Sequence, residues 1–401
     1  MMSDIRAHWR TVFGPTGSIW LVGFRPFFIA TCVTGALFPM IWVSIYSGIF
    51  DPIMDSFNPY LSPLHWHMHE MFFGFGWALL GGFLLTASKN WLGIRGVHGL
   101  TLAGLVALWV LDRIAMAQGG SWSETTVYAL SLPFITAIVL LLEVDLLSNH
   151  AKDTYRDNFY FVLALPVFII AKMALLSNQV DPALGTSMTL GLFRLCFLIM
   201  LERTLEAFMK GGFGITLKRI PIIDHAIKSI GFMLIFVYWM DTTLSTLLYL
   251  ALGTLMLIRL AYWAPTKALR RIDIGIMYLG YLAIAASLFM LCIPAQYSHW
   301  GSSLATHTFT LGTIGLIAPA MIIRISKGHT GRKVTFTTTD KICLYLMMSA
   351  LVFRIGVPFF LPHLYTMCLM LSAACWFATF TILGFQYIPV LLAPRVDQRV
   401  H

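Results

Sequence analysis

The chain has 401 residues, of which 58% are hydrophobic and only 11% are charged. Soluble domains carry about 25% charged residues, so this composition excludes a water-soluble enzyme of this length as well as a disordered chain. The six cysteines lie in apolar runs without Cys-x-x-Cys spacing, which favours small buried side chains over a disulfide framework. The net charge is +9. The positions of the basic residues along the chain show whether this charge reflects membrane topology or a nucleic-acid partner.

Twelve apolar stretches are long enough to cross a bilayer as helices, which takes about 20 residues each. They lie at 27–49, 66–88, 98–118, 124–147, 159–178, 186–209, 226–242, 244–263, 274–296, 303–325, 341–361 and 364–391. The sequence therefore predicts an all-α polytopic integral membrane protein, with one transmembrane domain over 1–401 and short tails at 1–18 and 393–401. No small-residue cleavage site precedes the first stretch, so we do not expect a cleavable signal peptide.

Lysine and arginine fall in alternate connectors. The connectors that contain neither residue are those around 50–64, 119–123, 179–185, 242–243, 297–302 and 362–363. Cytoplasmic loops are the ones enriched in basic residues, so both termini and both tails are predicted to be cytoplasmic. Topology and attraction to anionic membrane lipids then account for the positive charge, and no nucleic-acid partner is expected.

Several cations lie inside the predicted spans, where a charge is costly and often functional. Those in the outer half of the membrane, by the predicted topology, are Arg113, Lys172, Arg194 and Arg354. Those near the inner ends of spans are Arg25, Arg259 and Arg324. The ordinary explanation is that each pairs with a helix carbonyl or extends to the interface. An anionic ligand such as the propionates of a haem would also offset their burial.

Histidines gather at the outer ends of the predicted spans. They are His65, His67 and His69 just before Glu70 in the second span, His307 in the tenth, His363 at the start of the twelfth, and His299 in an outer connector. A lone histidine at a helix end is usually a hydrogen-bonded interface residue. Imidazole is also the commonest protein ligand for haem iron, copper and zinc, so the triplet H-W-H-M-H-E is a candidate metal site.

Helical geometry limits what this triplet can bind. At about 100° per residue, His65 and His69 share one face, whereas His67 points roughly 160° away. The three side chains therefore cannot bind one ion from a regular helix. Two interpretations remain: the first turn after Pro63 is irregular, or the helix holds a haem on one side and another metal on the other.

Three segments resemble the NnrS family of bacterial membrane proteins. They are G-F-R-P-F-F at 23–28, the segment beginning W-H-M-H-E-M-F-F-G-F-G-W at 66–93, and H-T-F-T-L-G with R-I-S-K-G-H-T-G-R at 307–332. R-T-L-E-A-F-M-K after the sixth span departs from the polar pattern of the family. The resemblance implies a haem- and copper-containing membrane protein linked to nitric oxide and denitrification. The matching motif residues are His67, His69, His307 and His329, with Arg25, Glu70, Arg324 and Arg332.

We therefore expect a haem b and copper protein of the bacterial inner (cytoplasmic) membrane that binds nitric oxide and reduces 2 NO to N2O. The expected metal ligands are His67, His69 and His307, with His65 and His363 as further candidates. The expected cofactor-binding residues include His329, Arg25, Arg113, Arg324 and Arg354. Glu70 is the expected proton relay. The electron donor is left open, with quinol as one candidate.

Two other functions remain in view. One is a protein that binds, senses or delivers nitric oxide or a metal without turnover. The other is a secondary transporter, since twelve spans are common in that class. Transporter sites lie near the membrane midplane, whereas the histidines here cluster near one face, so the transporter is the less favoured alternative.

Overall fold

The computed structural model describes residues 12–14, 16–49, 62–118, 122–177, 179–293 and 301–398, without the side chains of 301 and 302. His299 and most of the outer connectors 50–64 and 297–302 lie outside these residues. Helices but no strands are present in the described ranges. Twelve of the helices are long and apolar enough to cross a membrane, which confirms the predicted all-α polytopic membrane protein. The cytoplasmic location of the termini stays a prediction.

The observed spans agree closely with the predicted ones. They are Phe24–Tyr46, Pro63–Leu92, Gly99–Gln118, Glu124–Ser148, Arg156–Leu176, Pro182–Phe213, Pro221–Trp239, Thr242–Ala261, Ile272–Leu291, Ser303–Gly328, Thr338–Phe360 and Pro362–Leu392. The largest differences are at the start of the seventh span, at Pro221 and not 226, and at the end of the ninth, at Leu291 and not 296.

Local capping explains why several spans begin and end where they do. The Ser62 side chain accepts a hydrogen bond from the backbone N–H of His65 (3.3 Å) at the start of the second span. The Asp241 side chain accepts one from Leu244 (2.9 Å) at the start of the eighth. Gly93 ends the second span in the left-handed conformation (φ 63°), which favours glycine.

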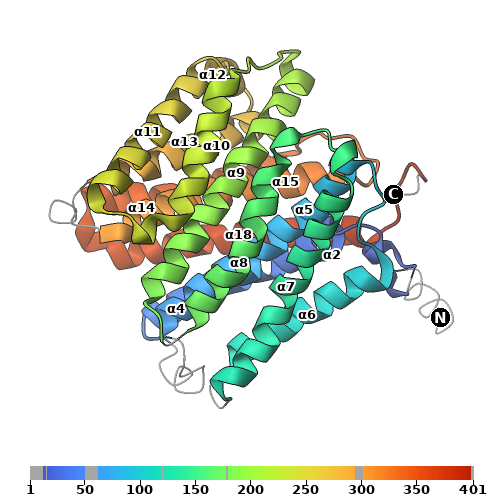
Figure 1. The fold of residues 1–401 in the computed structure, drawn as a ribbon, viewed down its shortest axis with the longest axis horizontal. Coiled ribbons are helices and arrows are strands. Elements are labelled where there is room, and N and C mark those ends of the chain that lie inside the picture. Colours follow the sequence, from blue (N-terminus) through green and yellow to red (C-terminus); the bar gives the residue numbers. More distant parts are fainter. Residues whose placement is uncertain are drawn as a thin grey trace. The chain divides into compact units, whose positions relative to one another are not determined.

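The described helices group into two compact units. Unit 1 comprises Met1–Gly185, Ile322–Thr335 and Phe380–His401. Its helices are α2 (Phe24–Tyr46), α4 (Pro63–His69), α5 (Trp77–Leu92), α6 (Gly99–Gln118), α7 (Glu124–Ser148) and α8 (Phe159–Leu176), with short 3-10 turns at Ser18–Trp20, His150–Lys152 and Arg156–Asn158. Within this unit α2 packs on α5, α6 on α7, and α7 on α8 (Figure 1).

Unit 2 comprises Thr186–Met321 and Phe336–Thr379. Its helices are α10 (Pro221–Met233), α11 (Thr242–Ala261), α12 (Pro265–Ala268), α13 (Ile272–Leu291), α14 (Gly301–Phe309), α16 (Thr338–Leu351) and α17 (Val357–Phe360), with 3-10 turns at Leu234–Trp239 and Pro362–Leu364. The helices α9 (Pro182–Phe213), α15 (Leu316–Gly328) and α18 (Tyr365–Leu392) contribute residues to both units. In unit 2, α13 packs against α11 and α14 (Figure 1). It also packs against α16. A single transmembrane domain stays a prediction.

Three spans contain a π-helical segment within the described residues. These segments are η2 (Glu70–Gly76), η8 (Thr310–Gly315) and η9 (Val352–Gly356). The first begins at Glu70, the second follows His307 closely, and the third contains Arg354. Such segments are rare and occur frequently at functional sites, and all three lie at or close to candidate residues.

Candidate functional site

The junction of α4 and η2 carries His69 and Glu70, whose exposed fractions are 0% and 2%. The Nδ1 atom of His69 lies 3.0 Å from Oε1 of Glu70. An Nδ1–H that donates to this carboxylate leaves Nε2 as the unprotonated ring nitrogen. Nε2 is buried and has no hydrogen-bond partner among the described residues. Metal-ligating histidines have this arrangement, with one nitrogen held by a carboxylate and the other open.

A chain of buried ion pairs extends from Glu70 into the neighbouring helices of unit 1. Arg113 on α6 donates from Nη1 to Oε1 of Glu70 (2.6 Å), and its Nη2 pairs with Oδ2 of Asp112. Lys172 on α8 donates from Nζ to the same Asp112 oxygen (2.6 Å) and to the carbonyl oxygen of Ser131 (2.6 Å). We call Glu70, Arg113, Asp112 and Lys172 the four-charge network.

The four-charge network contains two carboxylates and two cations. Its charges therefore balance inside the membrane, where an isolated charge would be expensive. Two of the cations noted in the sequence, Arg113 and Lys172, thus have counter-charges that the chain itself supplies. A cofactor-binding role for Arg113 stays a prediction, and in the structure its guanidinium contacts carboxylates.

Gly74 makes the contact between Arg113 and Glu70 sterically feasible. A Cβ atom at this position would overlap Nη1 of Arg113, and it would lie 3.1 Å from Oε2 of Glu70. The indole of Trp109 donates to the carbonyl oxygen of Gly74 (3.1 Å), and its ring lies 5.6 Å from the guanidinium carbon of Arg113. Close packing of Arg113 therefore explains why the family-like motif has a glycine at this position.

The three histidines of the triplet have different surroundings. The ring of His67 stacks on Trp42 of α2, with centroids 4.5 Å apart and an interplanar angle of 17°. His69 instead packs on Phe73, and His65 is half-buried near the start of α4. The helix α4 is regular from Pro63 to His69, so the irregularity begins after the triplet. An irregular first turn after Pro63 is therefore not observed, and the number of sites that this helix faces stays a prediction.

No group of three or more His, Cys, Asp or Glu side chains that could hold a metal ion is found in the part of the chain that the structure describes. The candidates therefore do not converge on one multi-ligand centre there. His363, in the 3-10 turn Pro362–Leu364, is exposed.

A second candidate centre lies in unit 2, around His307 on α14. Its Nδ1 lies 2.8 Å from the carbonyl oxygen of Ser303, one turn earlier, so Nδ1–H donates to this oxygen. Arg354 places Nη2 at 3.2 Å from Oγ of Ser303 and 3.3 Å from Nδ1 of His307. Its guanidinium carbon also lies 5.5 Å from the ring centroid of Tyr365. His307 and Arg354, which the sequence places in the tenth and eleventh spans, are thus neighbours in the structure.

The remaining motif residues meet at the predicted inner end of unit 1. The ring of His329 lies 5.5 Å from that of Phe24, so the motifs at 23–28 and 324–332 are in contact. Burial, and then the charges of Lys89 and Arg395, lower the pKa of His329 to about 4. The imidazole is therefore neutral at physiological pH.

The arginines of these motifs have structural partners. Arg25 is fully buried and donates from Nη1 to the carbonyl oxygens of Leu391 (2.8 Å) and Ala393 (2.7 Å). A cation at these carbonyls stabilises the C-terminal end of α18. Arg332 donates to Oγ1 of Thr330 (2.9 Å), and Arg324 is half-buried on α15.

Sequence reasoning missed the carboxylates that neutralise buried cations. Asp112 stands beside Arg113 in L-D-R, and an acid next to a cation inside an apolar run was the available signal. In unit 2, Arg259 is held by Glu202 (2.8 Å) and Asp224 (3.3 Å), and it donates from Nε to the Tyr281 hydroxyl (2.9 Å). Glu202 lies just before R-T-L-E-A-F-M-K, the segment that departs from the family pattern.

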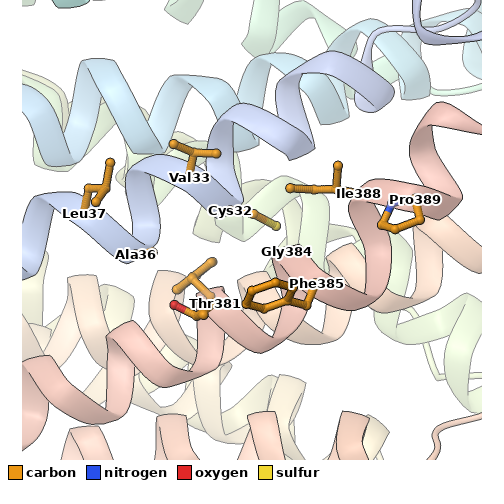
Figure 2. A pocket seen from close by; sticks show the side chains of 10 residues that line it. Cys32, Val33, Ala36, Leu37, Thr381, Gly384, Phe385, Ile388 and Pro389 are labelled. Atoms are coloured by element: carbon orange, nitrogen blue, oxygen red, sulfur yellow. The ribbon is translucent and has the colours of Figure 1, made fainter. Parts of the chain in front are cut away.

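An apolar groove of about 420 Å³ lies between α2 and α18 in unit 1 (Figure 2). Its lining includes Val33 and Leu37 from α2 and Phe385 and Ile388 from α18. Phe385 is 82% exposed, as expected for a side chain that faces lipid. The described residues that line this groove carry no imidazole or carboxylate, so it is not part of either candidate centre.

The fold and the buried site define a multi-pass helical membrane protein with imidazole and charged groups held inside its spans. The chain belongs to the NnrS family, because the family model described as NnrS protein matches residues 18–395. This match includes all the motif segments that carried the resemblance. A search of curated proteins finds no match. Family membership fits a membrane protein related to nitric oxide.

Proposed function

We propose that this protein is a haem b and copper protein of the bacterial inner membrane that binds nitric oxide and reduces it to N2O. The observation that carries the proposal is the pair formed by His69 and Glu70. It presents one buried ring nitrogen held by a carboxylate and a second nitrogen that has no hydrogen-bond partner among the described residues. Family membership and the multi-pass fold support the link to nitric oxide, a small lipid-soluble substrate.

The residues fit a haem better than a protein-ligated copper centre. A haem iron needs one or two axial ligands from the protein, and His69 alone meets that requirement through Nε2. His67 and His307, which have other surroundings, are the next candidate ligands. The described residues assemble no group of three metal-binding side chains, so we assign no ligands to copper and derive no step from it.

A haem supplies, when bound, an iron site for nitric oxide and a route for electrons. Glu70 orients the His69 ring by accepting its Nδ1–H, and Arg113 holds the carboxylate in place. Reduction of 2 NO to N2O and water consumes two electrons and two protons. The Glu70 carboxyl would hold one of these protons beside the reacting centre, and the remaining Arg113, Asp112 and Lys172 would then carry one net positive charge. The electrons would come from an external donor, for which we propose a quinol.

The experiment that tests the proposal compares His69→Ala with His65→Ala in purified protein. We expect His69→Ala to lose the Soret absorption band, and His65→Ala to keep it, because the His65 ring is not part of the buried pair. In the unmodified protein this band should shift on addition of nitric oxide. Equal haem content in both variants would contradict the assignment of His69.

Gas chromatography of N2O then separates reduction from binding alone. With a chemical reductant, the unmodified protein should produce N2O, and Glu70→Gln should keep the haem but lose most of this production. A haem-loaded protein that binds nitric oxide and makes no N2O would favour the binding or sensing function. Full N2O production by Glu70→Gln would leave Glu70 with only a structural role.

A further inference from the structure

Arg194 is a buried cation inside a membrane span of unit 2. It lies in the first half of α9 (Pro182–Phe213), and only 4% of its surface is exposed. Its neighbours along the helix, including Phe193, Leu195 and Cys196, are fully buried and apolar. The guanidinium is therefore surrounded by a medium that stabilises charge poorly.

Arg194 differs in its partners from three other buried cations. Arg113, Lys172 and Arg259 each pair with at least one carboxylate. Among the described residues, none forms an ion pair or a hydrogen bond with Arg194, and its Nε atom is buried without a partner. The chain therefore supplies no counter-charge for this guanidinium within the described residues.

The contact that is observed for the Arg194 guanidinium is with an aromatic ring. Its guanidinium carbon lies 5.3 Å from the ring centroid of Phe309, on α14. A neutral aromatic ring attracts a cation but does not balance its charge.

Arginine cannot escape the cost of burial by losing its proton. Lysine in the same place could become neutral, whereas guanidinium keeps its charge in proteins. A buried, unneutralised charge is strongly destabilising, so its presence requires a compensating group. The planar guanidinium also presents two parallel N–H donors, the geometry that matches two oxygens bonded to one atom.

We infer that Arg194 binds a planar oxyanion from outside the chain, in a site beside the ring of Phe309. Two sources share this chemistry: the propionate carboxylate of a haem, and a small free anion such as nitrite or formate. The propionate source rests on the proposed function, but the free-anion source does not.

The test uses the purified full chain in lipid nanodiscs, with Arg194→Met as the variant and Arg259→Met as its matched control. In the free-anion arm, haem-free protein is titrated with sodium nitrite and sodium formate against sodium chloride at equal ionic strength. A bound anion raises the melting temperature in a saturable manner. Arg194→Met should abolish this rise. Arg259→Met removes a paired cation, so it should lower the melting temperature and keep the anion response.

In the propionate arm, haem-free protein is loaded with haem or with haem dimethyl ester, which lacks both carboxylates. If a propionate is the anion, the unmodified protein should bind haem roughly 10- to 100-fold more tightly than the ester, as expected for charge-assisted hydrogen bonds. Arg194→Met should bind both alike. Absence of any haem binding would refute the proposed cofactor and leave the free-anion arm to decide this inference.

The inference is overturned if Arg194→Met matches the unmodified protein in both arms. It is also overturned if neither arm detects an anion in the unmodified protein. Should Arg194→Met fail to fold, Arg194→Lys provides the same comparison, because it keeps the charge but loses the two parallel donors. A response to oxyanions that Arg194→Lys retains in full would refute the two-oxygen geometry.

Discussion

Replacing Asp112 by asparagine tests the four-charge network directly. One carboxylate oxygen, Oδ2, pairs with both Lys172 (2.6 Å) and Arg113. Asp112 and Lys172 are each 0% exposed. Asp112→Asn keeps the size and shape of the side chain but leaves two cations and one carboxylate in the network. The perturbation is therefore electrostatic, and its effect measures how strongly this site depends on charge balance.

The structure sets the size of the expected effect. Removing one partner of a buried ion pair costs about 3–5 kcal/mol. Asp112 serves two cations, so we expect a value near the upper end, although Lys172 keeps the Ser131 carbonyl and Arg113 keeps Glu70. In a unit of this size, each kcal/mol lowers the melting temperature by roughly 2–4 °C. The expected decrease is therefore about 10–20 °C.

Thermal unfolding of purified protein in nanodiscs, followed by circular dichroism, measures this decrease. The matched control is Asp145→Asn on α7, because Asp145 forms no ion pair among the described residues, and it should change the melting temperature little. The double variant Asp112→Asn with Lys172→Met removes one charge of each sign and should recover more than half of the loss. If Asp112→Asn destabilises no more than Asp145→Asn, or if the double variant is less stable than the single one, the reasoning about charge balance is wrong.

Three further predictions follow from other parts of the molecule. Reporter fusions at residue 181 should be periplasmic and those at 152, 215 and 333 cytoplasmic, and one inverted result would refute the predicted topology. Because the pKa of His329 falls to about 4 from an ordinary 6.5, the folded state binds fewer protons than the unfolded state between these values. Stability should therefore decline as pH falls from about 6.5 to 4. The melting temperature of His329→Gln should lose this pH dependence. If the variant has the same pH profile as the unmodified protein, the burial of a neutral His329 ring is contradicted. Gly74→Ala should lower the melting temperature by displacing Arg113 from Glu70, whereas Gly104→Ala, where an added Cβ meets nothing within 4 Å, should not.

The sequence alone determined the helical spans and their number. Hydropathy is a local property, because a bilayer requires each spanning segment to be apolar by itself. The predicted stretches therefore match the observed spans to within a few residues without any knowledge of packing. The family-like motifs also singled out His69 and Glu70, which stand together in H-W-H-M-H-E and whose side chains are in contact in the structure.

Tertiary structure decided which of the buried polar groups are partners. Arg113 and Glu70 are 43 residues apart in sequence, and Lys172 and Asp112 are 60 apart. No periodicity predicts such pairs, because they depend on how neighbouring helices pack and rotate about their axes. The π-helical segment that begins at Glu70 alters the rotation of the residues that follow it, so a regular 100° pattern cannot describe the whole span. Arg113 and Arg194 are both cations inside apolar spans, so the sequence does not distinguish them. Packing places carboxylates beside Arg113, whereas no carboxylate among the described residues pairs with Arg194.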